Sequence, residues 1–395
     1  MKNILMVIPN LRMAGAEKSL VSLIRSLDPK RVNVDVFLFE TGGILQQQLP
    51  KWVNVIEENY VTRAMTLEMR LYFFDLIKSL KFGAAFSRFK ITFDAFFHNK
   101  FGKKAKFSWR TVEKYISVLP KHYDVAVGYL EGYSDFFVID KVQADKKIGW
   151  IHIDMTGKKI LEEEIQYYNA FDELATISDV CLDAACKAFP GIENKIQIIE
   201  NIVLPKDVRS RANENITDKW ENTDVCHLVS VGRLEYQKGM DIAAKAAKVL
   251  VDRGCSFCWH IYGKGSMQPE IEQYIKENNL EAAFVLEGLR ENPYPYIKNA
   301  DIMVQPSRWE GKSIVLDEAK ILGKAIVVTN YPSVYDQVTD KITGLITDIT
   351  PEAIADGIEE LIKNNELKEK LEYNCLNEPN QSEKAVNKFY KMIEA

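Results

Sequence analysis

The sequence predicts an α/β protein with two doubly wound domains that face each other across a cleft. Its 395 residues correspond to roughly two to three typical domains. Short apolar runs alternate with amphipathic stretches, a pattern typical of a parallel sheet covered by helices on both faces. The alternation stops at a polar stretch, residues 205–224, and then begins again. We therefore expect one domain on each side of that stretch.

Residues 1–204 are predicted to form the first domain. Its apolar runs have the length of buried strands, while Glu17–Leu27 and Val180–Phe189 have helical spacing. The first apolar run is too short for a signal peptide, so we interpret it as the first strand. The predicted strands are Ile4–Ile8, Val32–Phe39, Tyr123–Tyr129, Lys147–Ile151, Glu173–Ile177 and Ile196–Ile199.

Residues 205–224 are predicted to be a linker, because they are polar and lack apolar periodicity. Residues 225–376 then form the second domain, and ligands of such domains bind at the carboxyl ends of the strands. The amphipathic segment within 377–395 predicts a helix that could pack back on the first domain. The predicted strands of the second domain are Val225–Val231, Ser256–Tyr262, Ala283–Glu287, Ile302–Val304, Ala325–Val328 and Gly344–Ile346.

A helical insertion at about 60–122 interrupts the alternation. It holds 13 Lys or Arg residues against 4 Asp or Glu residues, whereas the whole chain has a net charge of −5. Aromatic side chains, mostly phenylalanine, are interleaved with these cations. Such a segment suits an anionic membrane surface. It suits equally a helical subdomain whose aromatic residues form a core, and both interpretations stay open.

The composition argues against several classes of protein. The net charge of −5 disfavours a nucleic-acid binder. The sequence has no apolar run of about 18 residues, the length that predicts a membrane-spanning helix. The six cysteines form no disulfide framework, and Cys255 and Cys258 lie in a predicted strand. We therefore expect structural thiols in a reduced, cytoplasmic setting.

Two carboxylates span a predicted loop-to-helix junction in the second domain. Glu310 precedes the helix and Glu318 lies inside it, eight positions later. Eight helical residues rise by about 12 Å. The free N–H groups and the dipole of a helix start favour an anion. A nucleotide-sugar fits this arrangement, with its diphosphate over the helix start and a hydroxyl-bearing ring near each carboxylate.

A basic loop follows the first strand of the second domain. Arg233 and Lys238 lie on it, between Gly232 and Gly239. A guanidinium fork and a compact ammonium group can converge on one diphosphate, and a glycine lets the next helix begin close to a ligand. Alone, the loop is better explained by two solvated cations. The loop of Glu310 in the same domain favours the diphosphate.

Two further candidates lie in the first domain. Gly15 belongs to a small-residue turn after the first strand, where the backbone can approach a ligand. The turn is not a GxGxxG motif, so NAD binding is disfavoured. His152 ends a predicted strand and could donate a hydrogen bond to a substrate hydroxyl or phosphate. Without other support, a structural histidine is the simpler interpretation.

The sequence lacks the motifs of several other chemistries. It has no Asp-x-Asp motif, no cluster with metal-ligand spacing, no nucleophile elbow and no P-loop. We therefore expect neither a metal nor another cofactor. The charge of a diphosphate would be neutralised by Arg233, Lys238 and helix amides.

Together the motifs resemble the retaining glycosyltransferases of family 4, which have the GT-B fold of two Rossmann-like domains. Among these enzymes, the chain is similar to bacterial glycosyltransferases of polysaccharide and capsule biosynthesis. It extends over nearly the whole chain, and the motifs in this order are specific to the family. They are Gly15–Glu17, Gly232–Arg233, Lys238–Gly239, Tyr262–Gly265, Asn299–Asp301, Pro306–Ser307 and the pair of Glu310 and Glu318.

The resemblance implies a role for each candidate residue. The nucleotide would bind to the second domain and the acceptor to the first. Glu310 and His152 would be the catalytic candidates beside the donor sugar, and Glu318 would bind the ribose. Leu289 and Arg290 would lie by the base. The residues implied in binding the diphosphate are Arg233, Lys238, Gly15, Lys312, Ser313 and Ile314.

The sequence departs from the family at Lys312 and Ser313, where Phe-Gly is common. The resemblance implies transfer of a hexose-type sugar from a nucleotide-diphosphate donor, a UDP-sugar, to a glycan or a lipid-linked saccharide. That reaction would take place in the cytoplasm or at the inner face of the membrane. The alternatives are a GT-B nucleotide-sugar epimerase and a non-catalytic sugar-nucleotide-binding module.

Overall fold

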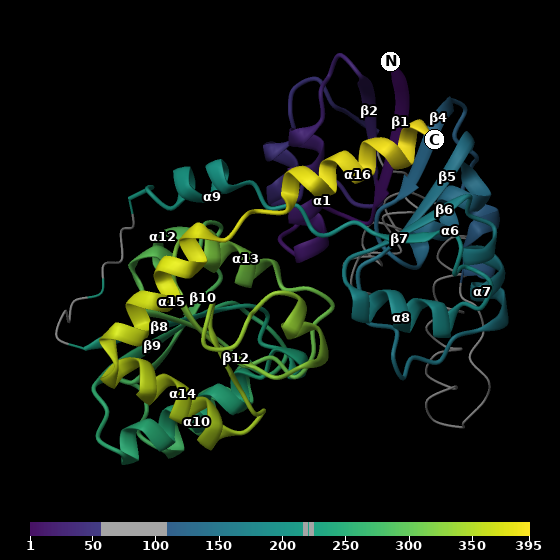
Figure 1. The fold of residues 1–395 in the computed structure, drawn as a ribbon. Coiled ribbons are helices and arrows are strands. Elements are labelled where there is room, and N and C mark those ends of the chain that lie inside the picture. The colour runs from purple at the N-terminus through teal and green to yellow at the C-terminus, as the bar shows by residue number, and fades with distance from the viewer. Residues whose placement is uncertain (57–108, 216–219, 221–224) are drawn as a thin grey trace, which may run out of the picture. The chain divides into compact units, whose positions relative to one another are not determined.

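The computed structural model describes residues 1–56, 109–215, 220 and 225–395, which divide into two compact units (Figure 1). One unit comprises Met1–Ile177, Cys181–Ile202 and Lys384–Ala395, and the other comprises Ser178–Val180 and Val203–Glu383. Each unit contains one parallel sheet, of seven strands in the first and six in the second. The predicted fold class of two doubly wound α/β domains is confirmed.

The sheet of the first unit has the strand order β3-β2-β1-β4-β5-β6-β7, and all its neighbours pair in parallel. Its central strands are buried on both faces, which is why they read as continuous apolar runs. The strands are β1 (Lys2–Ile8), β2 (Val32–Leu38), β3 (Asn54–Ile56), β4 (His122–Gly128), β5 (Gln143–Ile151), β6 (Glu173–Thr176) and β7 (Ile196–Ile198).

The helices of the first unit lie between successive strands of the chain, and α1 buries one apolar face. In α1 this face includes Leu20, Leu23 and Ile24, which are three and four positions apart. The helices are α1 (Gly15–Ser26), α5 (Trp109–Val112), α6 (Tyr133–Lys141), α7 (Glu162–Asn169) and α8 (Asp179–Ala188).

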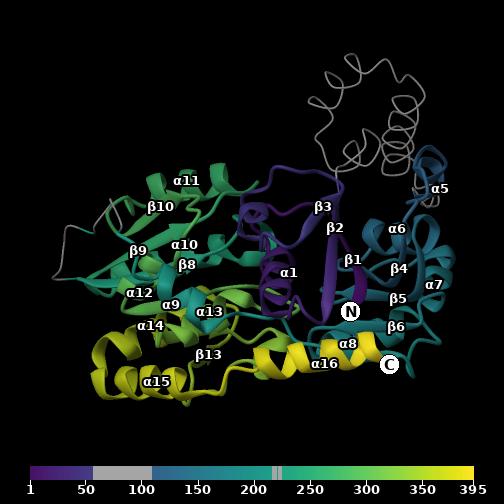
Figure 2. The same cartoon turned by 90° about the horizontal axis from the view of Figure 1, so that it is seen from above.

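The last helix, α16 (Ser382–Glu394), packs on the first unit (Figure 2). The Lys388 ammonium donates to the carbonyl oxygen of Ile198 at 2.7 Å, and the Phe389 ring lies 6.1 Å from that of Trp150. Phe389 is fully buried. The C-terminal end of the chain therefore completes the core of the unit that contains its N-terminal end.

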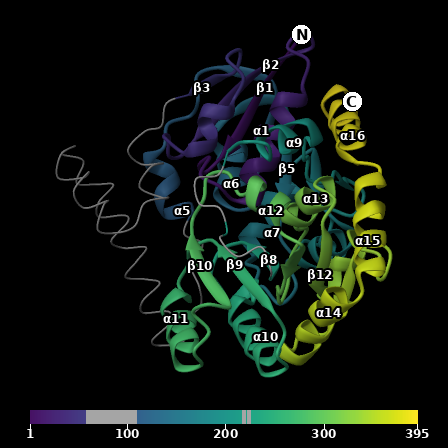
Figure 3. The same ribbon diagram turned by 90° about the vertical axis from the view of Figure 1, so that its left-hand side faces the viewer.

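The sheet of the second unit has the strand order β10-β9-β8-β11-β12-β13, again parallel throughout. Figure 3 shows its helices arranged around the sheet. The strands are β8 (Cys226–Val231), β9 (Phe257–Tyr262), β10 (Phe284–Gly288), β11 (Ile302–Gln305), β12 (Ala325–Thr329) and β13 (Leu345–Thr347). The helices are α9 (Pro205–Arg211), α10 (Met240–Asp252), α11 (Gln268–Glu277), α12 (Tyr294–Asn299), α13 (Ile314–Ile321), α14 (Pro351–Lys363) and α15 (Asn365–Asn377).

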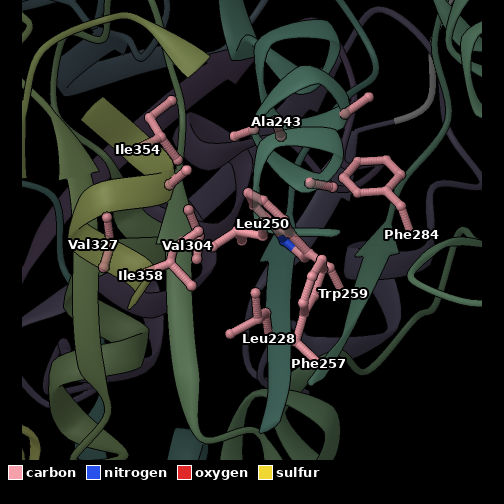
Figure 4. Packing of buried hydrophobic residues seen from close by; sticks show 14 of the residues in the cluster. Leu228, Ala243, Leu250, Phe257, Trp259, Phe284, Val304, Val327, Ile354 and Ile358 are labelled. Carbon is pink, nitrogen blue, oxygen red and sulfur yellow. The ribbon is translucent and has the colours of Figure 1, made fainter. Parts of the chain in front are cut away.

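Two apolar clusters hold this second sheet between its helices. One cluster joins the strands to α10, α11 and α14, and Figure 4 shows Leu250, Ile358, Val304 and Leu228 among its side chains. The other joins the strands to α9, α12 and α13. A sheet covered on both faces leaves its carboxyl-end loops as the natural place for a ligand.

The first part of the stretch predicted as a linker, 205–224, is helical in the structure. Pro205–Arg211 form helix α9, and Val208 and Ala212 are buried in a core cluster of the second unit. A proline in the first turn and two apolar residues four positions apart explain the helix. The boundary between the units instead falls between Ile202 and Val203.

The basic insertion predicted at 60–122 lies largely outside the described residues, which resume at Trp109. Trp109 is fully buried, and its indole N–H donates to Asp140 at 2.7 Å. The prediction of membrane contact therefore falls mainly on residues without a described structure. Within the described ranges, we find no helix that is both long and apolar enough to span a bilayer.

Candidate active site

An ion pair joins two loops at the carboxyl edge of the second sheet. Lys238 ends a short 3₁₀ turn after β8, and Glu310 lies between β11 and α13. The Lys238 ammonium donates to Glu310 Oε1 at 2.6 Å. Arg233, on the same loop as Lys238, has an exposed side chain. The structure therefore brings two of the predicted site residues into direct contact.

The Glu310 carboxylate accepts several further donors although its side chain is only 7% exposed. The Ser307 hydroxyl donates to Oε1 at 2.7 Å, and the carboxamides of Gln305 and Gln237 approach at 3.4 and 3.5 Å. A buried charge needs such partners to offset its lost hydration. Glu310 is thus held in a defined position before any ligand binds.

Gly239 explains how the two loops come so close. Its φ is +67°, and a Cβ there would lie 1.9 Å from the carbonyl oxygen of Pro306. Only glycine combines this left-handed conformation with backbone contact to the neighbouring loop. The sequence predicted Gly239 as a residue that lets the next helix begin close to a ligand. In the structure it also packs the loop of Lys238 against that of Glu310.

Replacing Gly239 with alanine is expected to lower the free energy of unfolding by about 3 kcal/mol, since it adds a backbone clash to conformational strain. Gly254 is a matched control, because its φ is +73° and its added Cβ would meet open space. Gly254→Ala should cost only about 1 kcal/mol. Urea unfolding of the two variants measures the difference, and equal losses would argue against the close approach at Gly239.

The start of α13 is held by a side chain that the sequence did not indicate. The Ser313 N–H donates to Gln337 Oε1 at 2.7 Å, so this amide is engaged within the unit. The next amides, of Ile314 and Val315, open the first helical turn and have no intrahelical acceptor. Lys312 is partly exposed beside them. An anion at this helix start would meet those two amides before that of Ser313.

The other site residues predicted for this unit lie within α13 and after β10. Glu318 on α13 is fully buried and accepts a hydrogen bond from the Tyr294 hydroxyl at 2.8 Å. Burial and the Glu318 charge raise the pKa of Tyr294 well above its usual range, so this hydroxyl stays a donor. Leu289 is half-exposed after β10, and Arg290 donates to the carbonyl oxygen of Glu287 at 2.8 Å.

In the first unit, Gly15 begins α1 and His152 follows β5. His152 is 7% exposed, and its ring stacks on that of Trp150 with a centroid distance of 5.7 Å. Burial lowers the pKa of His152 to about 3, so the ring is neutral over the physiological range. Neither ring nitrogen makes a well-oriented hydrogen bond with the described residues, although the Asn201 side chain lies nearby.

Two acids that the sequence analysis missed lie near the end of β5. Glu131 accepts the His152 backbone N–H at 2.9 Å. Asp135, in the first turn of α6, is fully buried, and its oxygens make no well-oriented hydrogen bond with described residues. Burial above all, with the charge of Glu131, raises the pKa of Asp135 well above its usual range. No sequence signal separates such an acid from an ordinary helix-start aspartate.

The raised pKa of Asp135 predicts a dependence of stability on pH. The folded state binds this proton more tightly than the unfolded state, so folding free energy is lost as pH rises above about 4. Asp135→Asn removes the titration. Relative to the parent, the variant should become more stable as pH increases from 5 to 8. Urea unfolding at both values measures this, and a pH-independent difference would contradict the assignment.

In the part of the chain that the structure describes, no three His, Cys, Asp or Glu side chains gather closely enough to hold a metal ion.

Comparison with known proteins gives a family for the second unit. Residues 213–377 match the family described as glycosyl transferases group 1. The poly(ribitol-phosphate) alpha-N-acetylglucosaminyltransferase of Staphylococcus aureus (strain COL) is 28% identical over 97 residues, covering 25% of this chain and 20% of that protein. A Campylobacter jejuni relative, N-acetylgalactosamine-N,N'-diacetylbacillosaminyl-diphospho-undecaprenol 4-alpha-N-acetylgalactosaminyltransferase, is 31% identical over 142 residues, covering 35% and 36% of the two chains. The matches thus span about a fifth to about a third of these relatives.

Solved structures match over the full length. S. aureus TarM, as a mutant in complex with Fondaparinux, alpha-GlcNAc-glycerol and UDP, superimposes with a TM-score of 0.70 at 14% identity, covering 100% of both chains. Anabaena Alr3699/HepE in complex with UDP and glucose gives 0.69 at 15%, also covering 100% of both. Such identities show the fold alone. Residues 213–377 are thus similar to the group 1 glycosyltransferases, and the two parallel sheets of the chain are those of the GT-B fold.

Proposed function

We propose that this protein is a retaining glycosyltransferase that moves a hexose-type sugar from a UDP-sugar to a hydroxyl of a glycan or lipid-linked saccharide, without a metal ion. One observation carries the proposal. Lys238, Glu310 and the start of α13 converge within the unit that matches the glycosyltransferase family. A cation, a carboxylate and free helix amides are the groups that a sugar diphosphate requires.

In this proposal the second unit binds the donor. Arg233, Lys238, Lys312 and the backbone amide of Ile314 neutralise the diphosphate, and Glu310 contacts the sugar hydroxyls. Ser313, whose amide is held by Gln337, positions this helix start. The acceptor attacks the anomeric carbon on the face from which the diphosphate departs. The departing phosphate oxygen then takes the acceptor proton, so the reaction requires no protein nucleophile.

The other proposed contacts are to the nucleoside and from the first unit. Glu318 binds the ribose, and Leu289 and Arg290 lie by the base. Gly15 adds a backbone contact to the diphosphate. His152, which is neutral, donates a hydrogen bond to the sugar. The first unit binds the acceptor.

The acceptor class is proposed from the relatives. One relative is named for a diphospho-undecaprenol substrate, and one structural neighbour, with a TM-score of 0.59, is a lipopolysaccharide galactosyltransferase. We propose a lipid-linked saccharide acceptor for this chain and a cytoplasmic protein attached to the inner membrane face. Flotation with anionic liposomes at low and high salt tests the attachment, and an absence of binding at low salt would end that part of the proposal.

A panel of nucleotide-sugars tests the central proposal. UDP-glucose, UDP-N-acetylglucosamine, UDP-galactose and GDP-mannose are each assayed for thermal stabilisation and for slow hydrolysis, with and without EDTA. We expect one UDP-sugar to stabilise the protein and to be hydrolysed equally in EDTA. NMR of the released sugar should show the donor's anomeric configuration. Binding without turnover would favour a sugar-nucleotide-binding module, and a changed sugar would favour an epimerase.

A further inference from the structure

Ser313, the residue before α13, is fixed by three side-chain hydrogen bonds. Gln337 makes two of them, because its Oε1 accepts the Ser313 N–H at 2.7 Å and its Nε2 donates to the Ser313 carbonyl at 2.8 Å. Gln305 makes the third, with its Oε1 accepting from the Ser313 hydroxyl at 2.7 Å. All three residues are buried. The Gln337 carboxamide thus pairs with both the N–H and the carbonyl group of Ser313, as the backbone of a neighbouring strand would.

The same network reaches Glu310. Gln305 Nε2 lies 3.4 Å from both the Ser307 hydroxyl and Glu310 Oε1, and Ser307 donates to that oxygen at 2.7 Å. The Ser333 hydroxyl donates to the Glu310 backbone carbonyl, also at 2.7 Å. The start of α13 and the carboxylate of Glu310 are therefore connected through buried hydrogen bonds.

The chemistry of the network requires carboxamides. A carboxamide both donates and accepts, whereas a carboxylate only accepts and a thioether does neither well. Gln337 Nε2 also lies 3.1 Å from Asp317 Oδ1, so a carboxylate in the place of the Gln337 carboxamide would face a second carboxylate. The link to Gln305 needs the Ser313 hydroxyl. The glycine that is common at this position in family 4 could not supply it.

We infer that Gln305 and Gln337 are positioning residues that hold the start of α13 at a fixed distance from Glu310. This inference rests on the proposed function for the identity of the two ends, a phosphate-binding helix start and a sugar-binding carboxylate. Neither glutamine need touch the substrate. Their effect is to keep two substrate contacts in one geometry, where a displacement of about 1 Å can cost a hundredfold in rate.

Hydrogen exchange of the ligand-free protein tests the physical part without any assay of activity. In Gln337→Met, amides of residues 311–318 should exchange at least about tenfold faster than in the parent. Gln273→Met is the control, since Gln273 is an exposed residue on α11 whose carboxamide donates to Glu277 on the same helix. Unchanged protection at 311–318 in Gln337→Met would overturn the inference whether or not the protein is a transferase.

Gln337→Glu adds a test by pH. As a carboxylate, the new group loses both donated bonds and is repelled by Asp317, although Lys320 Nζ, bound to the backbone carbonyl of residue 337 at 2.8 Å, offsets part of this. Burial beside Asp317 raises the pKa of the new carboxyl group, and its protonated form can donate again. Protection factors at 311–318 should therefore recover as pH falls from 8 to 6. Loss that is independent of pH would count against the donated bond.

Kinetics separate positioning from a general loss of structure. With UDP-glucose as the probe, Gln305→Met and Gln337→Met should lower the hydrolytic kcat by about a hundredfold. The Kd for UDP should stay within a few-fold of the parent value. Parent protein that does not hydrolyse any UDP-sugar would refute the proposed function alone. Active parent and equally active variants would refute the positioning role alone.

Discussion

Replacing Lys238 with alanine is expected to reduce turnover of the nucleotide-sugar by about a thousandfold, while the protein stays folded. The ammonium is the cation that the structure places at the loop of Glu310, 2.6 Å from its carboxylate. In the proposed reaction it stabilises the charge that develops on the leaving diphosphate, and loss of one such preorganised donor costs about 10² to 10³ in rate. Single-turnover kinetics with the donor found by the nucleotide-sugar panel measure the loss.

Lys248→Ala is the matched control for this variant. Lys248 also makes an ion pair, with Asp252 on the exposed side of α10, and lies outside the proposed site. Its removal should leave turnover unchanged and alter the free energy of unfolding by less than about 0.5 kcal/mol. Near-parent kinetics in Lys238→Ala would remove the diphosphate assignment. Lys238→Arg should recover only part of the rate, because a planar fork replaces a compact charge.

Most strands could be predicted from the sequence, because strands that are buried on both faces consist of continuous apolar residues. The prediction Val32–Phe39 corresponds to β2 at Val32–Leu38, and Ala325–Val328 corresponds to β12 at Ala325–Thr329. Strand β3 was not predicted, because none of its three residues is fully buried and its sequence, Asn-Val-Ile, forms no apolar run. Helix α9 was missed for another reason. Its polar residues outnumber the two that pack, and its stability comes from tertiary contacts that the sequence does not display.

In the candidate site too, the sequence indicates some of the residues and not others. Residue types and spacing indicated Lys238 and Glu310, since their motif is local to two loops. The partners that hold the site come from distant elements, such as Gln337 on Ser313 and Tyr294 on Glu318. A single glutamine or tyrosine carries no local signal of such a partnership. The sequence therefore indicates which groups meet a ligand better than it indicates which groups fix their positions.

Glu310→Gln is expected to lower kcat by about a hundredfold and to leave the affinity for UDP equal to that of the parent or higher. The amide keeps the shape of the side chain but weakens its hydrogen bonds to sugar hydroxyls in the transition state, and this weakening reduces the rate. Nucleotide binding responds differently. In the ligand-free protein Glu310 competes for the Lys238 ammonium, and a neutral residue 310 releases that cation for the diphosphate.

Calorimetry with UDP and steady-state kinetics with the UDP-sugar measure the two effects on one preparation of Glu310→Gln. An equal loss of UDP affinity and of kcat would show that Glu310 acts mainly on the structure of the loop. The double variant with Lys238→Ala sharpens the result. Because the two groups are in contact, their effects on UDP binding should be non-additive, with the gain from Glu310→Gln disappearing once the ammonium is absent. Additive effects would mean that the ion pair does not restrain Lys238 before the donor binds.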